Sequence, residues 1–312
     1  MNMHKVLVTG ASGFIGSHLC KKLASTGKIV IAQVRDVFPS PWGIWLKEAL
    51  DKCIQVTGDI TNFSFLKRVV SEYEVDSCFH LAAQAVVKVG LTNPSETFKV
   101  NVLGTAVLLE VCRQLDVPTV YIQSTDKAYG ERMDAKEEDP LVSTGIYETS
   151  KAMQDLLSQS YMNTYGLNII IGRSCNVYGF DAASRIVSNS IRSCLNGNPP
   201  IIYEGEKTKR QYIYIEDEVS AIQLLTKTQK NGIWNIATDD ILTQEQVVRK
   251  ICSFFPLTPK LVKRDKPLKE IQKQSVNWDK LKALGWKPKF TFEEGIQETI
   301  KKFERYGFDS AN

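Results

Sequence analysis

The chain lacks the residue patterns that mark metal sites, disulfide frameworks and membrane spans. It has only three histidines, and none of them is spaced with other ligands as a zinc site requires, so we assign no metal. Its seven cysteines include no C-x-x-C pair and stand mostly in apolar stretches, which is typical of reduced packing residues. No apolar run approaches the length that crosses a membrane. These absences point to an ordinary globular protein.

The chain also carries little net charge. Its 39 Lys and Arg residues against 35 Asp and Glu residues leave +4, an excess too weak and too dispersed to indicate binding to nucleic acid or to a membrane surface. The few residues before the first apolar strand leave no room for a signal peptide, and we therefore expect a cytoplasmic protein. At 312 residues and 43% hydrophobic composition, the chain can bury a full core in one large or two small domains.

Short apolar runs alternate with helical patterns through the first half of the chain. This rhythm predicts parallel strands joined by helical crossovers, and so an α/β fold. The predicted strands lie at 6–8, 29–34, 77–81 and 120–122, and the predicted helices between them at 17–25 and 63–73. Beyond residue 173 the pattern loosens, with prolines separating helices predicted at 244–254, 280–284 and 292–306. We interpret this second half as a smaller unit.

A glycine-rich segment follows the first predicted strand and opens directly into a helix. It reads Thr9-Gly-Ala-Ser-Gly-Phe-Ile-Gly16, which places the G-x-x-G-x-x-G spacing in the strand-to-helix context that makes the motif specific. The glycines let the backbone turn tightly and approach a pyrophosphate, which then meets free N–H groups and the positive end of the helix dipole. We therefore predict a dinucleotide cofactor bound by Gly10, Ser12, Gly13, Phe14, Ile15 and Gly16.

The ends of the following strands supply further predicted cofactor contacts. Arg35 and Asp36 follow the second strand and disagree, because an acidic side chain accepts hydrogen bonds from a free ribose diol whereas arginine pairs with a 2′-phosphate. NAD is favoured and NADP stays open. Asp59, beside Ile60, could take a hydrogen bond from the adenine amine or cap the helix that follows. The predicted strand at 77–81 ends beside small residues, which allow close approach of the cofactor at Leu81, Ala82 and Ala83.

A tyrosine and a lysine stand one helical turn apart in a predicted helix. Tyr147 and Lys151 share one face of it, since residues i and i+4 are neighbours on a helix. The charge of Lys151 is expected to lower the pKa of the phenol, which then takes a proton from an alcohol while a nicotinamide takes the hydride. Thr125, at the end of an apolar strand, adds a hydroxyl. Together with the glycine-rich segment, these residues predict alcohol oxidation at neutral pH.

Two predicted helices carry apolar residues on more than one face. Residues 101–115 are apolar beyond what packing on one sheet needs, and the Tyr147 helix also offers Met153, Leu156 and Tyr161. A second apolar face indicates either a helix pair at a subunit interface or burial under another element of the same chain. Both interpretations stay open at this point.

These motifs, with three others, resemble those of the extended short-chain dehydrogenase/reductases. The others are His80-Leu-Ala-Ala83, Asn101-Val-Leu-Gly-Thr105 and Arg173-Ser-Cys-Asn-Val-Tyr-Gly179. The resemblance implies a Rossmann-type doubly wound parallel sheet with a smaller C-terminal α/β substrate domain, a nucleoside-diphosphate sugar as substrate, a tightly held NAD(P), and a homodimer. It also implies cofactor contacts for Asn101, Tyr147 and Lys151. The cofactor domain is then expected at 1–174 plus about 211–238, and the nucleotide-sugar domain at 175–210 and 239–312.

Within that family, the two residues after the catalytic threonine separate the reactions. Here they are Asp126 and Lys127, a pair that resembles the 4,6-dehydratase branch. In that branch the matching Asp protonates the leaving C6 hydroxyl and the next residue, commonly Glu, removes the C5 proton. Lysine at this place is similar to CDP-glucose 4,6-dehydratases and to the inverting UDP-N-acetylglucosamine dehydratases. Asp126 supplies the acid if burial keeps it protonated, and Lys127 the base if its neighbours keep it neutral.

The resemblance also assigns substrate contacts. Asn176 matches the family's diphosphate-facing asparagine, while Arg185 and Arg210 match positions where arginine meets nucleotide or phosphate. Arginine suits these positions because its planar fork binds two phosphate oxygens at once. Gln84 and Ser124, at two strand ends, complete the predicted substrate set.

A nucleotide-sugar 4,6-dehydratase is therefore the leading hypothesis. The same oxidation could instead drive a 5,6-elimination with hydride return to C4, a 4-epimerisation, or a 2-epimerisation. From another class, a noncatalytic dinucleotide sensor would keep the fold but would not need the proton relay of Tyr147 and Lys151. An inert ion pair is the structural alternative to catalytic roles for Asp126 and Lys127.

Overall fold

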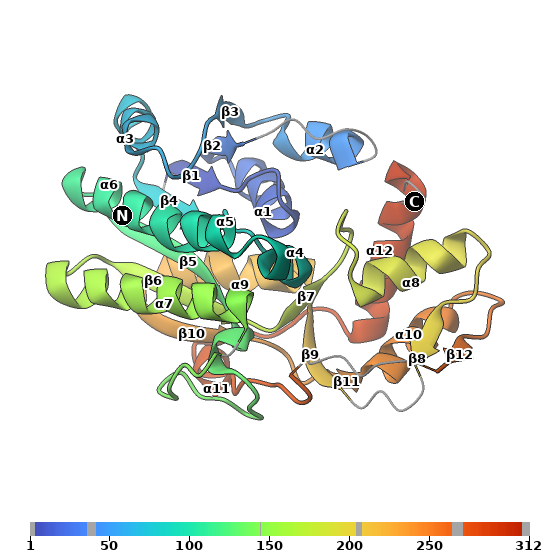
Figure 1. Cartoon of the computed structure of the whole chain (residues 1–312). Helices are drawn as coiled ribbons and strands as arrows, with labels where there is room; N and C mark the ends of the chain where they lie inside the picture. The colour runs from blue at the N-terminus through green and yellow to red at the C-terminus, as the bar shows by residue number, and fades with distance from the viewer. Residues whose placement is uncertain (1–3, 36–41, 144, 204–207, 264–270, 308–312) are drawn as a thin grey trace.

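The computed structural model of the protein describes residues 4–35, 42–143, 145–203, 208–263 and 271–307. Within these ranges a seven-stranded sheet forms the centre of the molecule, with the strand order β10-β6-β5-β4-β1-β2-β3 (Figure 1). Every neighbouring pair in it is parallel. The strands are β1 (Lys5–Thr9), β2 (Ile29–Val34), β3 (Ile54–Thr57), β4 (Ser77–His80), β5 (Thr119–Thr125), β6 (Ile169–Ser174) and β10 (Gly232–Ile236). The predicted α/β class with a Rossmann-type parallel sheet is confirmed.

Two helical layers cover the sheet, because its strands are apolar on both sides. Along β1, Val6 and Val8 belong to one buried cluster and Leu7 to another, as the alternation of side chains across a strand requires. In one layer α1 (Phe14–Ser25) packs against α2 (Trp42–Leu50) and α9 (Ile215–Thr228). In the other, α6 (Gly104–Gln114) packs against α3 (Phe63–Glu72) and α7 (Ile146–Tyr165). Among the described residues, no helix is both long enough and apolar enough to cross a membrane.

Two short helices and a π-helical turn join β4 to α6. They are α4 (Val87–Thr92), α5 (Pro94–Phe98) and the turn Lys99–Leu103. Asn93 begins α5 by accepting a hydrogen bond from the Glu96 N–H (3.3 Å), and Pro94 suits the first helical position because no donor is needed there. The helix predicted from Asn101 therefore starts with a wider turn, which places the Asn101 side chain in a buried position.

The second half of the chain builds a smaller unit around two short sheets. In the described residues, one sheet has the order β11-β9-β7 and the other pairs β12 with β8. The strands are β7 (Asn176–Tyr178), β8 (Ile201–Tyr203), β9 (Lys209–Tyr214), β11 (Ile241–Thr243) and β12 (Lys260–Val262). The helices are α8 (Ile186–Leu195), α10 (Gln244–Cys252), α11 (Asp279–Ala283) and α12 (Phe292–Tyr306). Capping boxes at Thr243 and Thr291 start α10 and α12, and the predicted ranges begin at the observed first residue of each helix.

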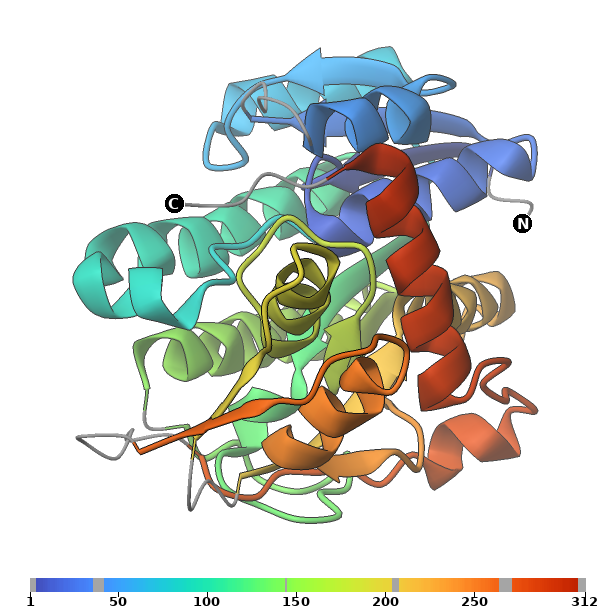
Figure 2. The same ribbon diagram turned by 90° about the vertical axis from the view of Figure 1, so that its right-hand side faces the viewer.

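The last helix, α12, ties the smaller unit to the helical layer of the large sheet. Figure 2 shows it running along the front of the molecule toward α2. At its end the Tyr306 hydroxyl donates to Glu48 of α2 (2.7 Å), and Arg305 pairs with the same carboxylate (2.9 Å). β9 joins the small sheet whereas β10 returns to the large one, so the chain crosses between the units more than once. The domain boundaries given above stay a prediction.

Candidate active site

The glycine-rich turn after β1 is shaped for close contact with a ligand. Gly10 has φ +68°, and a Cβ there would lie 2.7 Å from the backbone of Ala82, so only glycine fits. A Cβ on Gly16 would collide with the Gly10 carbonyl. α1 begins after Gly13, which has no side chain to cap the free N–H groups of the first helical turn, and these can therefore face a pyrophosphate. The turn fits the predicted dinucleotide, together with its chain neighbours Ser12, Phe14 and Ile15.

The end of β2 lies beside this turn. Gln33 accepts a hydrogen bond from the Gly10 N–H (3.0 Å) and donates to the Gly58 carbonyl (2.6 Å). The sequence pattern did not predict this link, because Gln33 belongs to no motif. Arg35 is exposed, and Asp36 lies outside the described residues. The choice between a free ribose diol and a 2′-phosphate is therefore not decided by these two side chains.

Asp59 holds a turn rather than the helix after it. Its carboxylate accepts hydrogen bonds from the Thr61 N–H and hydroxyl (both 2.8 Å), and the Thr61 N–H lowers its pKa. The N-cap of α3 is Asn62, whose side chain accepts from the Phe65 N–H (3.0 Å). Asp59 therefore does not cap the helix, as the alternative prediction held, but fixes the turn before it. The adenine contact of Asp59 and Ile60 stays a prediction.

His80, at the end of β4, is a structural link. It is fully buried, with Nδ1 2.8 Å from the Thr9 hydroxyl and Nε2 2.9 Å from the Thr105 hydroxyl. Burial lowers its pKa to about 3, so the ring is neutral at physiological pH. The Ala82 N–H donates to the same Thr9 hydroxyl (3.3 Å), which brings the small residues 81–83 against the cofactor turn.

Asn101 fastens the segment after β4 to α7. Its Oδ1 accepts the Gln84 N–H (2.7 Å), and its amide group donates to the Ser150 hydroxyl (2.8 Å). The side-chain carbonyl of Gln84 is buried and has no partner in the described part of the chain. A buried acceptor without a donor costs free energy, so it is a natural place for a ligand hydroxyl or amide. Gln84 therefore stays a predicted substrate contact.

Tyr147 lies in the first turn of α7, next to the end of β5. Burial raises the pKa of its phenol to about 12, against the opposing effects of the Arg185 guanidinium and of a hydrogen bond with Thr125. The prediction that the charge of Lys151 lowers this pKa is wrong for the present arrangement, because burial dominates and the cation that opposes it is Arg185. The structure does bring the Tyr147 and Thr125 hydroxyls together.

Lys151 points to the backbone of β5. It is buried, and its ammonium donates to the Gln123 carbonyl oxygen (2.6 Å) and to the side-chain carbonyl of Gln154. Burial lowers the pKa of Lys151 to about 7, so its charge changes in the neutral range. Sequence reasoning missed both partners, because each is a glutamine outside any motif. The contact with Gln123 couples Lys151 to the position of the strand that carries Thr125.

Asp126 and Lys127 begin a short 3₁₀ turn directly after β5. Asp126 is fully buried, with Oδ1 3.6 Å from the Lys127 ammonium and Oδ2 without a partner among the described residues. Lys127 also donates to Asn176 Oδ1 (3.0 Å), and the amide group of Asn176 donates to the Gln211 carbonyl (3.1 Å). Lys127 thus bridges the end of β5 to β7. The protonation states that elimination would require stay predictions.

A buried ion pair supports the end of β5. Asp155 of α7 and Arg173 of β6 form two hydrogen bonds of 2.8 Å each. The Ser124 hydroxyl donates to Asp155 (2.7 Å), and Arg173 donates to the Tyr129 hydroxyl (2.7 Å). Sequence reasoning missed this pair, since nothing local marks Asp155 as the partner of Arg173. The Ser124 hydroxyl is engaged here, and its contact with substrate stays a prediction.

Arg185 and Arg210 lie on the smaller unit. Arg185 pairs with Asp181 (2.9 Å), and its guanidinium lies 5.3 Å from the centre of the Phe14 ring, so it reaches the cofactor turn. Arg210 donates to the Ile271 carbonyl, which connects β9 to the chain at residue 271. The phosphate contacts assigned to both arginines stay predictions.

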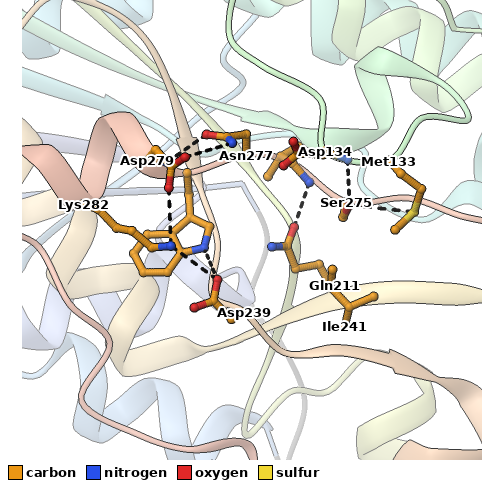
Figure 3. Close-up of a pocket in the computed structure, with 11 residues that line it drawn as sticks. Met133, Asp134, Gln211, Asp239, Ile241, Ser275, Asn277, Asp279 and Lys282 are labelled. Atoms are coloured by element: carbon orange, nitrogen blue, oxygen red, sulfur yellow. Dashed lines mark hydrogen bonds and ion pairs between the residues drawn. The ribbon is translucent and has the colours of Figure 1, made fainter.

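A pocket of about 350 Å³ lies between β9, β11 and α11 (Figure 3). Its walls include Gln211 and Trp278. Lys282 lies between Asp239 and Asp279, with its ammonium 3.6 Å and 3.4 Å from their carboxylates. The predicted catalytic residues are all described, and none of them lines this pocket. Lys282, Asp239 and Asp279 neutralise one another in this pocket. We therefore place the candidate site at the residues after β5 rather than in this pocket.

Three known proteins show what this chain is similar to. The dTDP-glucose 4,6-dehydratase of Haemophilus influenzae is 29% identical over 330 residues, which cover 96% of this chain and 97% of that one. The structure of the UDP-glucose 4-epimerase of Thermotoga maritima with UDP-glucose has a TM-score of 0.87 at 28% identity, covering 96% of this chain and 99% of that one. The dTDP-glucose 4,6-dehydratase of Streptomyces venezuelae, with NAD bound, has a TM-score of 0.87 at 26% identity, covering 96% and 97%.

A family model gives the more general result. The model of the NAD dependent epimerase/dehydratase family matches residues 6–237, well over half of the chain. This range contains the cofactor turn, β5 with the residues that follow it, and the first turns of α7. Since the sequence, the fold and the placement of these residues agree, the chain belongs to the NAD dependent epimerase/dehydratase family, within the extended short-chain dehydrogenase/reductases.

Proposed function

We propose that the protein is a nucleoside-diphosphate-sugar 4,6-dehydratase. The observation that carries this proposal is the pair after Thr125: a fully buried Asp126 with one unpartnered oxygen in the described structure, beside the Lys127 ammonium at 3.6 Å. An elimination needs an acid and a base at adjacent carbons, whereas epimerisation through the same C4 ketone needs neither. The similarity to dTDP-glucose 4,6-dehydratases supports the same reaction.

The oxidation step uses the residues at the start of α7. Tyr147 takes the proton of the C4 hydroxyl, and Thr125 hydrogen-bonds the same oxygen. NAD, when bound, accepts the C4 hydride and returns it at C6. A phenol whose pKa is raised to about 12 needs a nearby cation to act as a base, and Arg185 already lowers this pKa. Lys151 holds the cofactor from the same face of the helix.

The elimination step uses Asp126 and Lys127. Once C4 is a ketone, the C5 proton is acidic and the C6 hydroxyl is a β-leaving group. Lys127 removes the C5 proton, and Asp126 gives its proton to the C6 oxygen, which leaves as water. Lys127 then returns its proton to C5 as hydride reaches C6, which gives the 4-keto-6-deoxy sugar.

A hydrogen-bonded link between Tyr147 and Asp126 supports this sequence of steps. At the end of the reaction Tyr147 holds the proton from the C4 hydroxyl, while Asp126 has lost the proton that left with water. One proton must therefore pass from Tyr147 to Asp126 before the next turnover. Thr125 hydrogen-bonds both groups, with its hydroxyl 3.2 Å from Asp126 Oδ1. The residue that binds the C4 oxygen thus also provides the route by which the acid is recharged.

We further propose NAD as the cofactor and a nucleoside diphosphate as the anchor of the substrate. The description of the family as NAD dependent and the NAD-bound relative support the first point. Asn176, Arg185 and Arg210 would bind the diphosphate, with Arg185 placed between the cofactor turn and Tyr147. The base and the sugar are left to experiment.

A 4-epimerase is the second candidate. The Thermotoga maritima UDP-glucose 4-epimerase matches the fold as closely as the Streptomyces venezuelae dehydratase does, with a TM-score of 0.87 for each. Oxidation at C4 by Tyr147 is common to both reactions. We favour the dehydratase because the pair Asp126 and Lys127 would serve the elimination alone.

We propose that the protein is a homodimer joined through α6 and α7. Leu103, Met153, Leu156 and Tyr165 lie on or next to these helices, and each is more than 40% exposed although apolar or aromatic. The inner faces of the same helices pack against the buried cluster of the sheet. A pair of helices with a second apolar face is typical of a subunit interface. Light scattering in solution tests this proposal.

The product mass tests the proposed reaction. The protein is incubated with UDP-glucose, UDP-N-acetylglucosamine, CDP-glucose, GDP-mannose and dTDP-glucose, and the mass of each product is determined by mass spectrometry. Loss of one water supports a dehydratase, and an unchanged mass with one inverted stereocentre supports an epimerase. Deuterium from C4 that appears at C6 identifies the 4,6 reaction, whereas deuterium that returns to C4 identifies the 5,6 reaction.

Two substitutions assign the steps to residues. Tyr147→Phe and Lys127→Ala are each expected to reduce turnover by about 10²–10⁴-fold, as loss of a general acid or base does, while NAD binding is kept. Lys127→Ala should still pass hydride from C4 to the cofactor, because it leaves the oxidation residues intact. Lys250→Ala is the control, since Lys250 forms a surface ion pair with Glu293 and is not among the proposed site residues. Full turnover in Tyr147→Phe would contradict the mechanism.

A further inference from the structure

Glu218 is a buried acid that the proposed reaction does not use. It belongs to the first turns of α9 and is fully buried beneath the ends of β5 and β6. Its Oε1 accepts hydrogen bonds from the Ser174 hydroxyl (2.5 Å) and from the amide group of Gln123 (3.3 Å). Its Oε2 is buried without a partner in the described structure. Within the described residues the hydrogen-bond partners of Glu218 are neutral donors, so hydrogen bonds rather than a cation would stabilise its negative charge.

Gln123 connects Glu218 to the active site. The Tyr121 hydroxyl donates to Gln123 Oε1 (2.9 Å), while Gln123 Nε2 donates to Ser174 (2.7 Å) and to Glu218. The main-chain carbonyl of the same glutamine accepts the Lys151 ammonium (2.6 Å). One residue thus contacts Glu218 through its side chain and Lys151 through its main-chain carbonyl. Thr125 and Asp126 follow two and three residues later on the same strand end.

The groups that surround Glu218 favour a change of its charge near neutral pH. Burial raises its pKa to about 7, and the hydrogen bonds from Ser174 and Gln123 oppose this rise. Tyr121 on β5 and Cys175 after β6 both feel the Glu218 charge, and burial raises the pKa of each well above its ordinary value. Asp126 and Lys127 also influence the pKa of Cys175.

We infer that Glu218 is a positioning residue whose ionised form tightens the end of β5 and thereby sets the Gln123 carbonyl that holds Lys151. In the ionised form both Ser174 and Gln123 direct their donors at Oε1. In the protonated form Glu218 must itself donate a hydrogen, and the Ser174 hydroxyl oxygen at 2.5 Å can accept it once its own hydrogen turns away. This inference rests on the proposed cofactor role of Lys151 but not on the fate of the sugar.

The affinity for NADH as a function of pH tests the inference, because it needs no sugar substrate. Fluorescence titrations from about pH 5.5 to about pH 8.5 bracket the Glu218 ionisation. In the wild type the ionisation of Glu218 should raise the affinity by about three- to tenfold (the rising limb), while loss of charge on Lys151 lowers it (the Lys151 limb). Because both pKa values lie near 7, the rising limb is measured as the ratio of wild-type to Glu218→Gln affinity. Glu218→Gln keeps an acceptor for both donors but has no charge to gain, so the rise should be absent.

Ser174→Ala separates the two limbs of this profile. Without the Ser174 donor the ionised form of Glu218 is less favoured, so the rising limb should move to higher pH while the Lys151 limb stays in place. If Glu218→Gln changes thermal stability but its NADH profile keeps the shape of the wild-type profile, Glu218 is merely structural and the inference fails. If the wild type converts no nucleotide sugar yet the rising limb behaves as described, the proposed reaction fails and the inference stands.

Discussion

Besides Asp126, two buried carboxylates lie near the end of β5, Asp155 and Glu218, and their surroundings differ. Asp155 accepts two hydrogen bonds of 2.8 Å from one edge of the Arg173 guanidinium, from Nε and Nη2. Glu218 accepts only from the neutral donors Ser174 and Gln123, and one of its oxygens has no partner among the described residues. Both acids are fully buried, so burial alone does not separate them. What separates them is whether a cation compensates the charge.

This difference indicates that Asp155 stabilises the fold, whereas Glu218 influences the active site. The cation beside Asp155 is present at every pH at which proteins are folded, because an arginine guanidinium does not lose its proton in that range. The charge of Glu218 depends on pH, since burial raises its pKa to about 7. The first group therefore acts as a fixed support of β5, and the second as a variable one. The predictions below test this distinction from the largest expected effect to the smallest.

Removing the compensating cation should have the largest effect. Arg173→Met leaves the Asp155 carboxylate buried and unpaired, and such a change costs about 3–5 kcal/mol in the free energy of unfolding. It also removes the donor to the Tyr129 hydroxyl (2.7 Å). Urea-induced unfolding, followed by circular dichroism, measures the loss.

The matched control is the double variant Arg173→Met with Asp155→Leu. Replacing both members of a buried ion pair by apolar residues of similar size is often nearly neutral, because no charge is left uncompensated. The double variant should therefore regain most of the stability that the single variant loses. Equal losses in the single and double variants would show that Asp155 does not carry a buried charge that needs Arg173.

Removing the uncompensated charge of Glu218 should increase the stability of the protein rather than decrease it. The folded protein raises the pKa of Glu218 from 4.5 to about 7, so between these values the folded state holds a proton that the unfolded state has released. Stability relative to the unfolded chain is then lost as pH rises through this window, by up to about 3 kcal/mol in total. Glu218→Gln has no such loss and should be the more stable protein above pH 7.

Thermal unfolding of both proteins at several pH values checks this prediction. The difference in melting temperature should be small near pH 4.5 and should grow in favour of Glu218→Gln up to about pH 7. A difference that does not depend on pH would mean that Glu218 keeps one protonation state throughout. Greater stability with weaker NADH binding would identify Glu218 as a residue retained for function at the expense of stability.

The sequence allowed the fold and one half of the site to be predicted, because both depend on local patterns. The strand at 29–34 and the helix at 292–306 were located with their observed bounds, since hydrophobic periodicity and capping residues lie within a few positions of each other. α2 was not predicted, because the glycine and the two tryptophans in its first four residues have low helix propensity. The spacing of Tyr147 and Lys151 likewise follows from one helical turn.

The supports of the site could not be predicted, because their partners are distant in the sequence. Glu218 meets Gln123 across 95 positions and Ser174 across 44, and no local pattern carries that information. The wrong expectation for the pKa of Tyr147 has a related cause. The i, i+4 rule places Lys151 on the correct face, but the length of its side chain lets the ammonium reach the Gln123 carbonyl instead of the phenol. Arg185, from the smaller unit, takes the expected role.

The smallest effects come from the two serines that donate to these acids, Ser124 to Asp155 (2.7 Å) and Ser174 to Glu218 (2.5 Å). Ser124→Ala removes one donor from a carboxylate that keeps both bonds to Arg173, so it should cost about 1 kcal/mol at any pH. Ser174→Ala removes a donor from an acid whose charge changes. Its cost should rise from about 1 kcal/mol near pH 5, where Glu218 is protonated, to about 2 kcal/mol near pH 8, because hydrogen bonds to charged groups are the stronger. Urea unfolding at both pH values measures the four differences. Parallel losses in the two variants would erase the distinction between a compensated and an uncompensated acid, whereas a pH dependence confined to Ser174→Ala places the variable charge at Glu218.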